Sequence, residues 1–375
     1  MTPSSDAIPF NDLSRTSPEV MKQIEAAISK VLASGWFVMG PEHNALEQEL
    51  GAYFGAADAV LVANGTDALE LALAAVGVGV GDRVLTVANA AAYTSIAARL
   101  LGAVPSYCEV SPQTLLMSAD GVRQALSSAE VLPKAIVVTH LYGAMAPVQE
   151  IVAIAREYGI AVVEDCAQSI GATSDGRQSG TFGDIATTSF YPTKNLGALG
   201  DGGAVITNSG ELAASVRRMR QYGWDSKYHI AYDHGRNSRM DELQAAILRV
   251  KLPYLDVWND RRRQIHSRYQ DAVSSSARLV NTSSESFTAH LAVLMTDDRT
   301  GARSSFMRAG IGTDVHYPIP DNKQDFASNK PAAVSLPITE RAAEAVLSIP
   351  MFPELTEREV DRICVVLSEL GANNG

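Results

Sequence analysis

SFYPTKNLGALGDGGAVIT, residues 189–207, places a lysine between two strand-like segments, IATTSF (185–190) and the closing GAVIT. Lys194 follows Pro192 by two residues and stands among apolar residues and glycines. Most lysines are solvated surface charges. A lysine that is held beside a strand end and near another cation has a lowered pKa, so its free amine is a nucleophile that can form a Schiff base.

Apolar runs typical of strands alternate with helical stretches on the amino-terminal side of this segment. The runs lie at 59–63, 83–88, 104–108, 135–139 and 160–165, and the helical stretches lie at 67–76, 94–101 and 147–158. This alternation predicts an α/β domain with a largely parallel sheet. Ahead of it, Ser17-Pro18 and an apolar stripe that stops at Gly35 predict an amphipathic helix over 17–34.

The remaining third of the chain has a different organisation. Two helical patterns over about 239–270 lead out of the large domain. The sequence then predicts, in order, a strand (290–295), a helix (about 300–309), a further strand, a loop (318–335) and a last helix with the capping box Thr356-x-x-Glu359. We therefore expect a large α/β domain over 1–250, which includes the helix 17–34, and a smaller α+β domain over 251–375.

The composition is that of an ordinary folded protein, with 46% hydrophobic and 19% charged residues in a chain of 375. Its 31 Lys and Arg against 42 Asp and Glu give a net charge of −11, which argues against nucleic acid and anionic membranes as partners. The first residues lack the pattern of a signal peptide, and no apolar run is long enough to span a membrane. We expect a cytoplasmic protein.

The cysteines and histidines give no sign of a metal site. Cys108, Cys166 and Cys364 are far apart and form no CxxC motif, and Cys166 is interpreted as a small core residue. The only close histidine pair, His229 and His234, is five residues apart, so the two do not share one helical face. We interpret this pair as loop residues.

Two further motifs stand at strand ends. NGTDAL (64–69) follows a strand and opens a helix, so Gly65, Thr66 and the free N–H groups of the first turn suit an anion; an ordinary Asn or Thr cap is the alternative. Asp165 ends an apolar strand, where open α/β sheets bind ligands, and Gln168 can point to the same side. The alternative for Asp165 is a helix cap.

Together these motifs predict one ligand. Thr66 and Ser189 suit a phosphate, Asp165 suits a cationic ring nitrogen, and Lys194 suits an aldehyde. Pyridoxal 5′-phosphate carries all three groups.

The chain resembles the DegT/DnrJ/EryC1/StrS family of sugar aminotransferases, which has the aspartate-aminotransferase fold (fold type I). The segments that carry the resemblance are SGWFVMGPE (34–42), NGTDAL (64–69), HLYG (140–143), EDCAQSIGA (164–172), SFYPTKNLGALGDGGA (189–204), NSRMDELQAAILRVKL (237–252) and HYPIP (316–320). This resemblance implies a mixed, mostly parallel seven-stranded sheet between helices, with a smaller α+β carboxy-terminal domain. It also implies a homodimer with its active sites at the interface.

The resemblance assigns roles to individual residues. Lys194 holds the cofactor as the internal aldimine and moves protons, and Asp165 pairs with the pyridinium nitrogen. Gln168 contacts the phenolic oxygen. The phosphate is held by Gly65, Thr66 and Ser189, with Asn237 reaching it from the other subunit.

The implied reaction moves an amino group from L-glutamate to the ketone of a nucleotide-linked sugar by a ping-pong mechanism, with pyridoxamine 5′-phosphate between the two halves. The segments 87–98 and 221–228 look more like the branch that acts on dTDP-3-keto-6-deoxyhexoses; 4-keto nucleotide sugars and keto-cyclitols are the alternatives. Relatives that deoxygenate sugars have His where this chain has Lys194, which favours transamination over dehydration.

Substrate contacts are expected from aromatic and histidine side chains. Tyr93 follows Ala91 and Ala92 where the family often has an aromatic residue, and Trp224 and Tyr228 either stack on the sugar or anchor a packed loop. His316 and Tyr317 are carried over from HYPIP, although Asp321-Asn322 stands where the family commonly has Leu-His.

Functions of other classes are less consistent with the sequence. A nicotinamide oxidoreductase needs a glycine fingerprint between a strand and a helix, but GVGVGD (77–82) follows a helix and precedes a strand, as in a helix-end turn. A non-catalytic binding protein of the same fold is expected to lack Lys194 or Asp165, and both are present.

Overall fold

A seven-stranded sheet forms the centre of the protein in the computed structural model, which describes residues 6–326 and 334–371. Its strands are β1 (Asp58–Val62), β2 (Arg83–Val87), β3 (Val104–Cys108), β4 (Ala135–Thr139), β5 (Ala161–Asp165), β8 (Ile185–Ser189) and β9 (Gly203–Thr207). Their order across the sheet is β1-β9-β8-β5-β4-β2-β3. Only β9 runs antiparallel to its neighbours in this sheet. The predicted mixed, mostly parallel sheet is confirmed.

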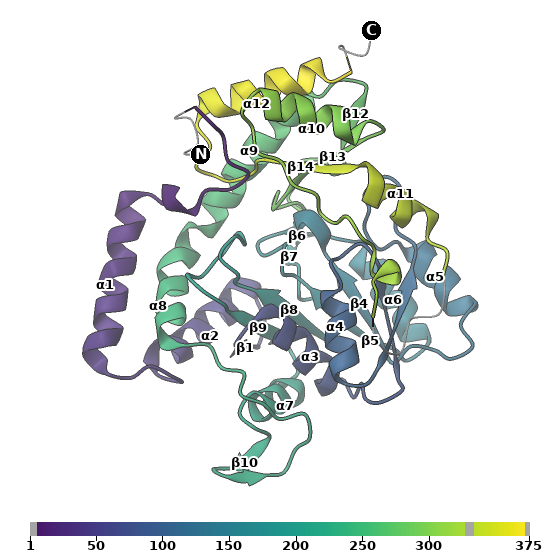
Figure 1. Ribbon diagram of the computed structural model, residues 1–375. Helices are drawn as coiled ribbons and strands as arrows, with labels where there is room; N and C mark the ends of the chain where they lie inside the picture. Colours follow the sequence, from purple (N-terminus) through teal and green to yellow (C-terminus); the bar gives the residue numbers. More distant parts are fainter. Residues whose placement is uncertain (1–5, 327–333, 372–375) are drawn as a thin grey trace.

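Helices cover both faces of this sheet (Figure 1). Successive strand side chains point to opposite faces, so in β1 Val60 and Val62 pack into one apolar cluster while Ala59 and Leu61 pack into another. The first face is covered by α3 (Gly65–Ala75), α4 (Tyr93–Leu100) and α7 (Gly210–Met219). The other is covered by α2 (Pro41–Phe54), α5 (Ala119–Ser127), α6 (Val148–Glu157) and α8 (Glu242–Lys251).

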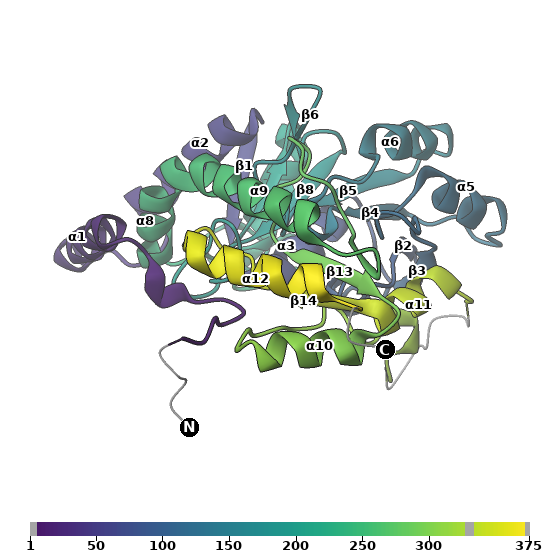
Figure 2. The same cartoon turned by 90° about the horizontal axis from the view of Figure 1, so that it is seen from above.

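A smaller unit lies over one edge of the large sheet (Figures 1 and 2). Its antiparallel sheet is made of β12 (Ala277–Leu279), β13 (Ala292–Thr296) and β14 (Val346–Ile349), and its helices are α9 (Leu255–Ala272), α10 (Arg299–Arg308), α11 (Pro337–Ala345) and α12 (Glu357–Glu369). The turn η3 (Leu252–Tyr254) joins α8 to α9. Since neither sheet borrows a strand from the other, we propose residues 1–250 and 251–375 as two domains.

The predicted helix ends are well supported. Helix α1 (Pro18–Ser34) begins after Ser17, whose side chain accepts the Val20 N–H, and ends at Gly35 with φ +65°. The Thr356/Glu359 capping box is present at the start of α12. The glycines of GVGVGD lie in the turn between α3 and β2, as predicted.

Several elements differ from the prediction. Helices α2, α5, α7 and α11 were not anticipated. The strand expected between 309 and 318 does not form, since Ile311 and Asp314 make only isolated bridges there, and β14 takes its place in the small sheet. Residues 327–333 of the expected loop lie outside the described residues. No described helix has the length and apolarity needed to cross a bilayer.

Candidate active site

A cavity of about 560 Å³ lies where the carboxyl ends of β5 and β8 face the small domain. Its lining includes Phe10 and Asn11 from the amino-terminal segment. Eight of the residues predicted from the sequence also line it, namely Gly65, Thr66, Tyr93, Asp165, Ser189, Lys194, His316 and Tyr317. The fold therefore brings together predicted residues that are up to 252 positions apart, from Gly65 to Tyr317.

Lys194 stands in a tight turn that follows β8. Its backbone N–H donates to the Tyr191 carbonyl (2.8 Å), and the chain doubles back so closely that a Cβ on Gly197 would lie 2.3 Å from the Pro192 oxygen. Removal of the amine from water lowers the pKa of Lys194 to about 8, against the opposing effect of the Asp165 carboxylate. Near neutral pH a useful fraction of this amine is therefore uncharged and nucleophilic.

Asp165 is the last residue of β5 and its carboxylate is buried. Oδ1 accepts the Ala167 N–H at 3.0 Å, and Oδ2 accepts only a long bond of 3.5 Å from Thr139 Oγ1. Burial raises the pKa of Asp165, and the hydrogen bond from Ala167 and the charge of Lys194 only partly offset this. Because this poorly solvated carboxylate lines the cavity, it suits a bound cation such as a protonated ring nitrogen. Asp165 caps no helix in the described chain, since a turn follows it.

The first turn of α3 contains the residues predicted to bind an anion. Asn64 is the helix cap and accepts the Asp67 N–H (2.8 Å), so the cap interpretation is correct. It does not exclude anion binding, because helix geometry leaves the N–H groups of Gly65 and Thr66 without partners inside the helix. A Cβ on Gly65 would lie 2.6 Å from the Cβ of Ser189, so only glycine lets this turn approach the end of β8. The phosphate contact predicted for Gly65, Thr66 and Ser189 stays a prediction.

Gln168 stands behind the cavity wall. Its Oε1 accepts the Tyr142 N–H (2.6 Å), and its Nε2 donates to the hydroxyl of Tyr317 (3.1 Å), which does line the cavity. Gln168 therefore positions Tyr317, and its direct contact with a cofactor oxygen stays a prediction.

Three predicted residues lie away from the cavity in this single chain. Trp224 and Tyr228 belong to an exposed hairpin of β10 (Trp224–Ser226) and β11 (His229–Ile230), which projects from the large domain (Figure 1). Their rings meet edge to face at 5.4 Å, so they anchor each other within the hairpin. Asn237 is exposed and accepts a hydrogen bond from Arg239 (2.8 Å). Roles for these residues at an active site require a second subunit.

His290 is a cavity residue that the sequence did not single out. A chain of hydrogen bonds fixes its tautomer. The Asn259 amide N–H donates to the Ile170 carbonyl, which leaves Asn259 Oδ1 to accept from the amide N–H of Asn195. Asn195 Oδ1 is then an acceptor, so His290 Nδ1, 2.9 Å away, must carry the proton. Burial lowers the pKa of His290, so the ring is neutral. Its Nε2 therefore carries a lone pair in the same cavity as Lys194.

Other lining residues were missed, either because they lie beside Lys194 in a segment whose other members were not singled out or because their local sequence carries no motif. Phe10 stacks on His316 with ring centroids 5.6 Å apart. The remaining missed residues include Asn11, Thr187, Thr188, Tyr191, Thr193, Asp201, Leu291, Asp314 and Met351. Asn11, Leu291, Asp314 and Met351 come from segments that meet the rest of the site only in the folded chain.

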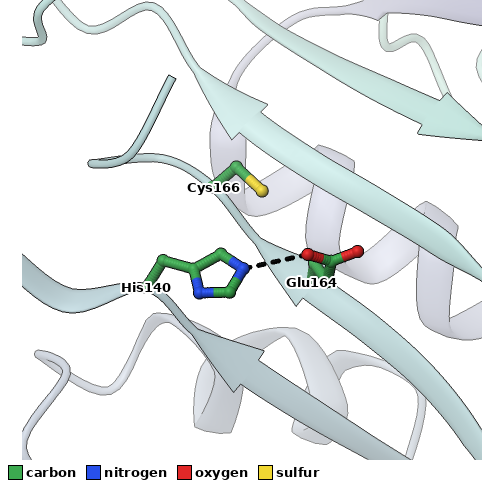
Figure 3. A group of neighbouring side chains, drawn as sticks. All are labelled: His140, Glu164 and Cys166. Carbon is green, nitrogen blue, oxygen red and sulfur yellow. Dashed lines mark hydrogen bonds and ion pairs between the residues drawn. The ribbon is translucent and has the colours of Figure 1, made fainter. Parts of the chain in front are cut away.

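His140, Glu164 and Cys166 form a buried group with ligand atoms within 4.8 Å of one another (Figure 3). Hydrogen bonds already use these atoms: His140 Nδ1 accepts the Ala146 N–H, and His140 Nε2 donates to Glu164 at 2.9 Å. Glu164 also accepts backbone N–H bonds from Gly180, Phe182 and Gly183. Burial raises the pKa of the Cys166 thiol, which stays protonated. We interpret the group as structural.

The histidine pair and the cysteine considered from the sequence as possible metal ligands lie apart from the cavity. The loop interpretation is wrong for His229, which lies in the exposed strand β11 with Nδ1 2.7 Å from Asp225, and right for His234, which lies in a turn. Cys166 is buried in the core beneath the sheet, as expected.

Comparisons with known proteins cover nearly the whole chain. The DegT/DnrJ/EryC1/StrS aminotransferase family matches residues 18–368. The chain is 38% identical to a UDP-2-acetamido-2-deoxy-3-oxo-D-glucuronate aminotransferase from Pseudomonas aeruginosa, over 96% of this chain and 99% of that protein. It is 40% identical to a dTDP-3-amino-3,4,6-trideoxy-alpha-D-glucose transaminase from Micromonospora megalomicea subsp. nigra, over 92% and 93%.

A solved structure agrees with these sequence matches. NtdA from Bacillus subtilis, crystallised with the bound cofactor PMP, superposes with a TM-score of 0.90 at 31% identity, over 98% of this chain and 85% of that one.

Proposed function

Since the chain belongs to the DegT/DnrJ/EryC1/StrS aminotransferase family, we propose that it transfers the amino group of L-glutamate to the 3-keto group of a dTDP-linked 6-deoxyhexose. It is a pyridoxal 5′-phosphate-dependent aminotransferase. The observation that carries the proposal is one cavity that is lined by Lys194, by the buried Asp165 and by Gly65 and Thr66 of the first turn of α3.

The cavity residues suit the cofactor group by group. Gly65, Thr66 and Ser189 would hold its phosphate, Asp165 its ring nitrogen and Lys194 its aldehyde carbon. When bound, the cofactor supplies a carbonyl that exchanges amines and a ring that takes up the electrons of a broken C–H bond.

Each of the two charged groups has a task that follows from its surroundings. The Asp165 carboxylate keeps a cation at the ring nitrogen favourable, because both groups are shielded from water. The Lys194 amine, with its pKa lowered to about 8, accepts and returns a proton near neutral pH. His290 Nε2 offers a further acceptor in the same cavity.

The names of the relatives support a nucleotide-linked sugar that carries its ketone at C3. The Pseudomonas relative is named for a 3-oxo sugar linked to UDP, and the Micromonospora relative for a 3-amino sugar linked to dTDP. Two segments resemble the 3-keto branch. Segment 87–98 places Tyr93 in the cavity lining, and segment 221–228 forms part of the exposed hairpin, which lies away from the cavity.

A homodimer is part of this proposal. The consecutive residues Trp36, Phe37 and Val38 leave 56%, 47% and 38% of their surface exposed, and a run of exposed apolar side chains supports an interface with another chain. Asn237, exposed here, would then reach the phosphate of the partner subunit. The three free cysteines support a reducing location such as the cytoplasm.

The experiment is amination by the holoenzyme of matched dTDP-3-keto and dTDP-4-keto 6-deoxyhexoses with glutamate. We expect kcat/KM to favour the 3-keto sugar by about 10²-fold or more, because a misplaced ketone loses its alignment with the reacting groups. NMR of the product identifies the aminated carbon. Preference for the 4-keto sugar or for a keto-inositol would contradict the proposed substrate while leaving the aminotransferase activity intact.

A further inference from the structure

Asp321 lies where this chain departs from the resemblance, directly after HYPIP. It begins the short turn η4 (Asp321–Lys323) of the small domain, and only 1% of its surface is exposed. Within residues 6–326 and 334–371, no ion pair involves its carboxylate. Its polar atoms reach into the large domain, to the segment 88–93 between β2 and α4.

Asp321 holds that segment at both ends. Its backbone N–H donates to the Ala88 carbonyl (2.7 Å), and its Oδ1 accepts the Ala92 N–H (2.8 Å). Its Oδ2 accepts the Ser95 hydroxyl (2.7 Å), which also lies 3.0 Å from the hydroxyl of Tyr107. One residue therefore spans the whole segment from the other domain.

The segment needs such support. Ala91 and Ala92 have φ of +59° and +60°, in the left-handed region that side-chain-bearing residues seldom adopt. Ala92 is also the N-cap of α4 and has no side chain able to cap a helix. The Asp321 side chain supplies the missing acceptor, because its Oδ1 takes the Ala92 N–H at the start of the helix.

Tyr93 follows immediately, lines the cavity and is 48% exposed, so it stands at the open side of the cavity. Glutamate is small, whereas a nucleotide-linked sugar must extend out of the cavity past such a residue. We propose that Asp321 is a positioning residue that fixes the segment 88–93, and through it Tyr93, for the keto sugar substrate; naming this ligand rests on the proposed function.

Three variants of the holoenzyme test this. Asp321→Ala removes both side-chain acceptors, Asp321→Asn keeps an oxygen for the Ala92 N–H, and Asn322→Ala is the matched control. Asn322 lies in the same turn, but its side chain bonds within the small domain, to Val334 and Glu340. Circular dichroism confirms that each variant is folded.

Two readouts are measured. We call the hydrogen bonds that join Asp321 to Ala88, Ala92 and Ser95 the clamp. Hydrogen exchange of the segment 88–95 reports the clamp in the absence of substrate, and we expect faster exchange in Asp321→Ala only. Kinetics report its use: the KM for the keto sugar should rise at least about tenfold in Asp321→Ala, while the glutamate half-reaction stays within about twofold. Asp321→Asn should recover most of the loss, and Asn322→Ala should match the wild type.

The outcomes separate this proposal from the proposed function. Unchanged exchange in Asp321→Ala overturns the clamp, whatever the substrate. An unchanged sugar KM, or equal losses in both half-reactions, overturns the positioning role. If the wild type aminates no nucleotide sugar, the proposed function is wrong, and so is the identification of the sugar as the ligand that Tyr93 contacts. In that case the hydrogen-exchange result alone decides whether the clamp exists.

Discussion

Replacement of Asp165 by Asn removes a charge from the cavity and little else. The amide oxygen of Asn can still accept the Ala167 N–H, which at 3.0 Å is the shorter of the two hydrogen bonds that the Asp165 carboxylate accepts within the described residues. The shape of the β5 end is therefore kept, while the partner of a protonated ring nitrogen is lost. Asp165→Asn should bind the cofactor and slow both half-reactions.

The magnitude follows from burial. Removing one partner of a buried ion pair costs about 3–5 kcal/mol. If the whole cost is felt in the transition state, the rate falls by roughly two to four decades. The variant should also lower the pKa of Lys194 further, because the Asp165 charge is what opposes the effect of burial on that amine.

The assay is a single-turnover reaction of holoenzyme with glutamate, followed by the absorbance of the cofactor. Asp184→Asn is the matched control, because Asp184 accepts the Val162 N–H (2.7 Å) at the opposite end of β5, away from the cavity. We expect near wild-type rates for this control. A rate for Asp165→Asn within about threefold of wild type would refute the role of the carboxylate, since it leaves less than 1 kcal/mol for the pair.

Three further predictions concern the nucleophile, the assembly and the clamp. Lys194→Ala should abolish transamination, measured as aminated sugar formed from glutamate, and a variant with wild-type turnover would remove Lys194 from the chemistry. A mixed dimer of Lys194→Ala and Asn237→Ala chains should regain activity at one of its two sites, whereas inactive mixtures after verified subunit exchange would mean that each site is built within one chain. Burial raises the pKa of Asp321 from 3.8 to about 7, so its contribution to stability is full below about pH 4 and is lost as the pH rises through 7. Between pH 5.5 and 8.5 the wild type should therefore lose about 2 kcal/mol of unfolding free energy that Asp321→Asn keeps, and parallel urea-stability curves for the two proteins would contradict this.

The strands that build the site could be predicted because they leave a strong local signal. Most of the seven central strands are short apolar runs; Asp165 ends one of them, and Lys194 lies in the turn that follows β8. Since the carboxyl ends of parallel strands share one edge of a sheet, both side chains had to meet there.

Helix α2 could not be predicted from an apolar stripe, because its buried face is partly polar. Glu42 and His43 are buried, and the backbone N–H groups of both donate to Glu242 of α8. A periodicity of apolar residues does not detect a helix that packs through buried carboxylates.

The part of the cavity lining that comes from the amino-terminal segment and the small domain could not be predicted from local sequence, for a physical reason. Phe10, His290 and Asp314 reach the cavity only because the amino-terminal segment and the small domain pack over the sheet edge. The clamp by Asp321 is of the same kind, since its partners lie more than 220 residues earlier in the chain. Contacts of this range follow from the fold and leave no mark in the nearby sequence.

The measurement that tests the central claim most directly is the position of the cofactor on the chain. Borohydride makes the bond between the cofactor and its lysine permanent, and mass spectrometry of the digested holoenzyme then locates the added mass. We predict that the cofactor is found on the peptide that contains Lys194 and on no other. Label on a different lysine, or no label on any lysine of a yellow holoenzyme, would contradict the account.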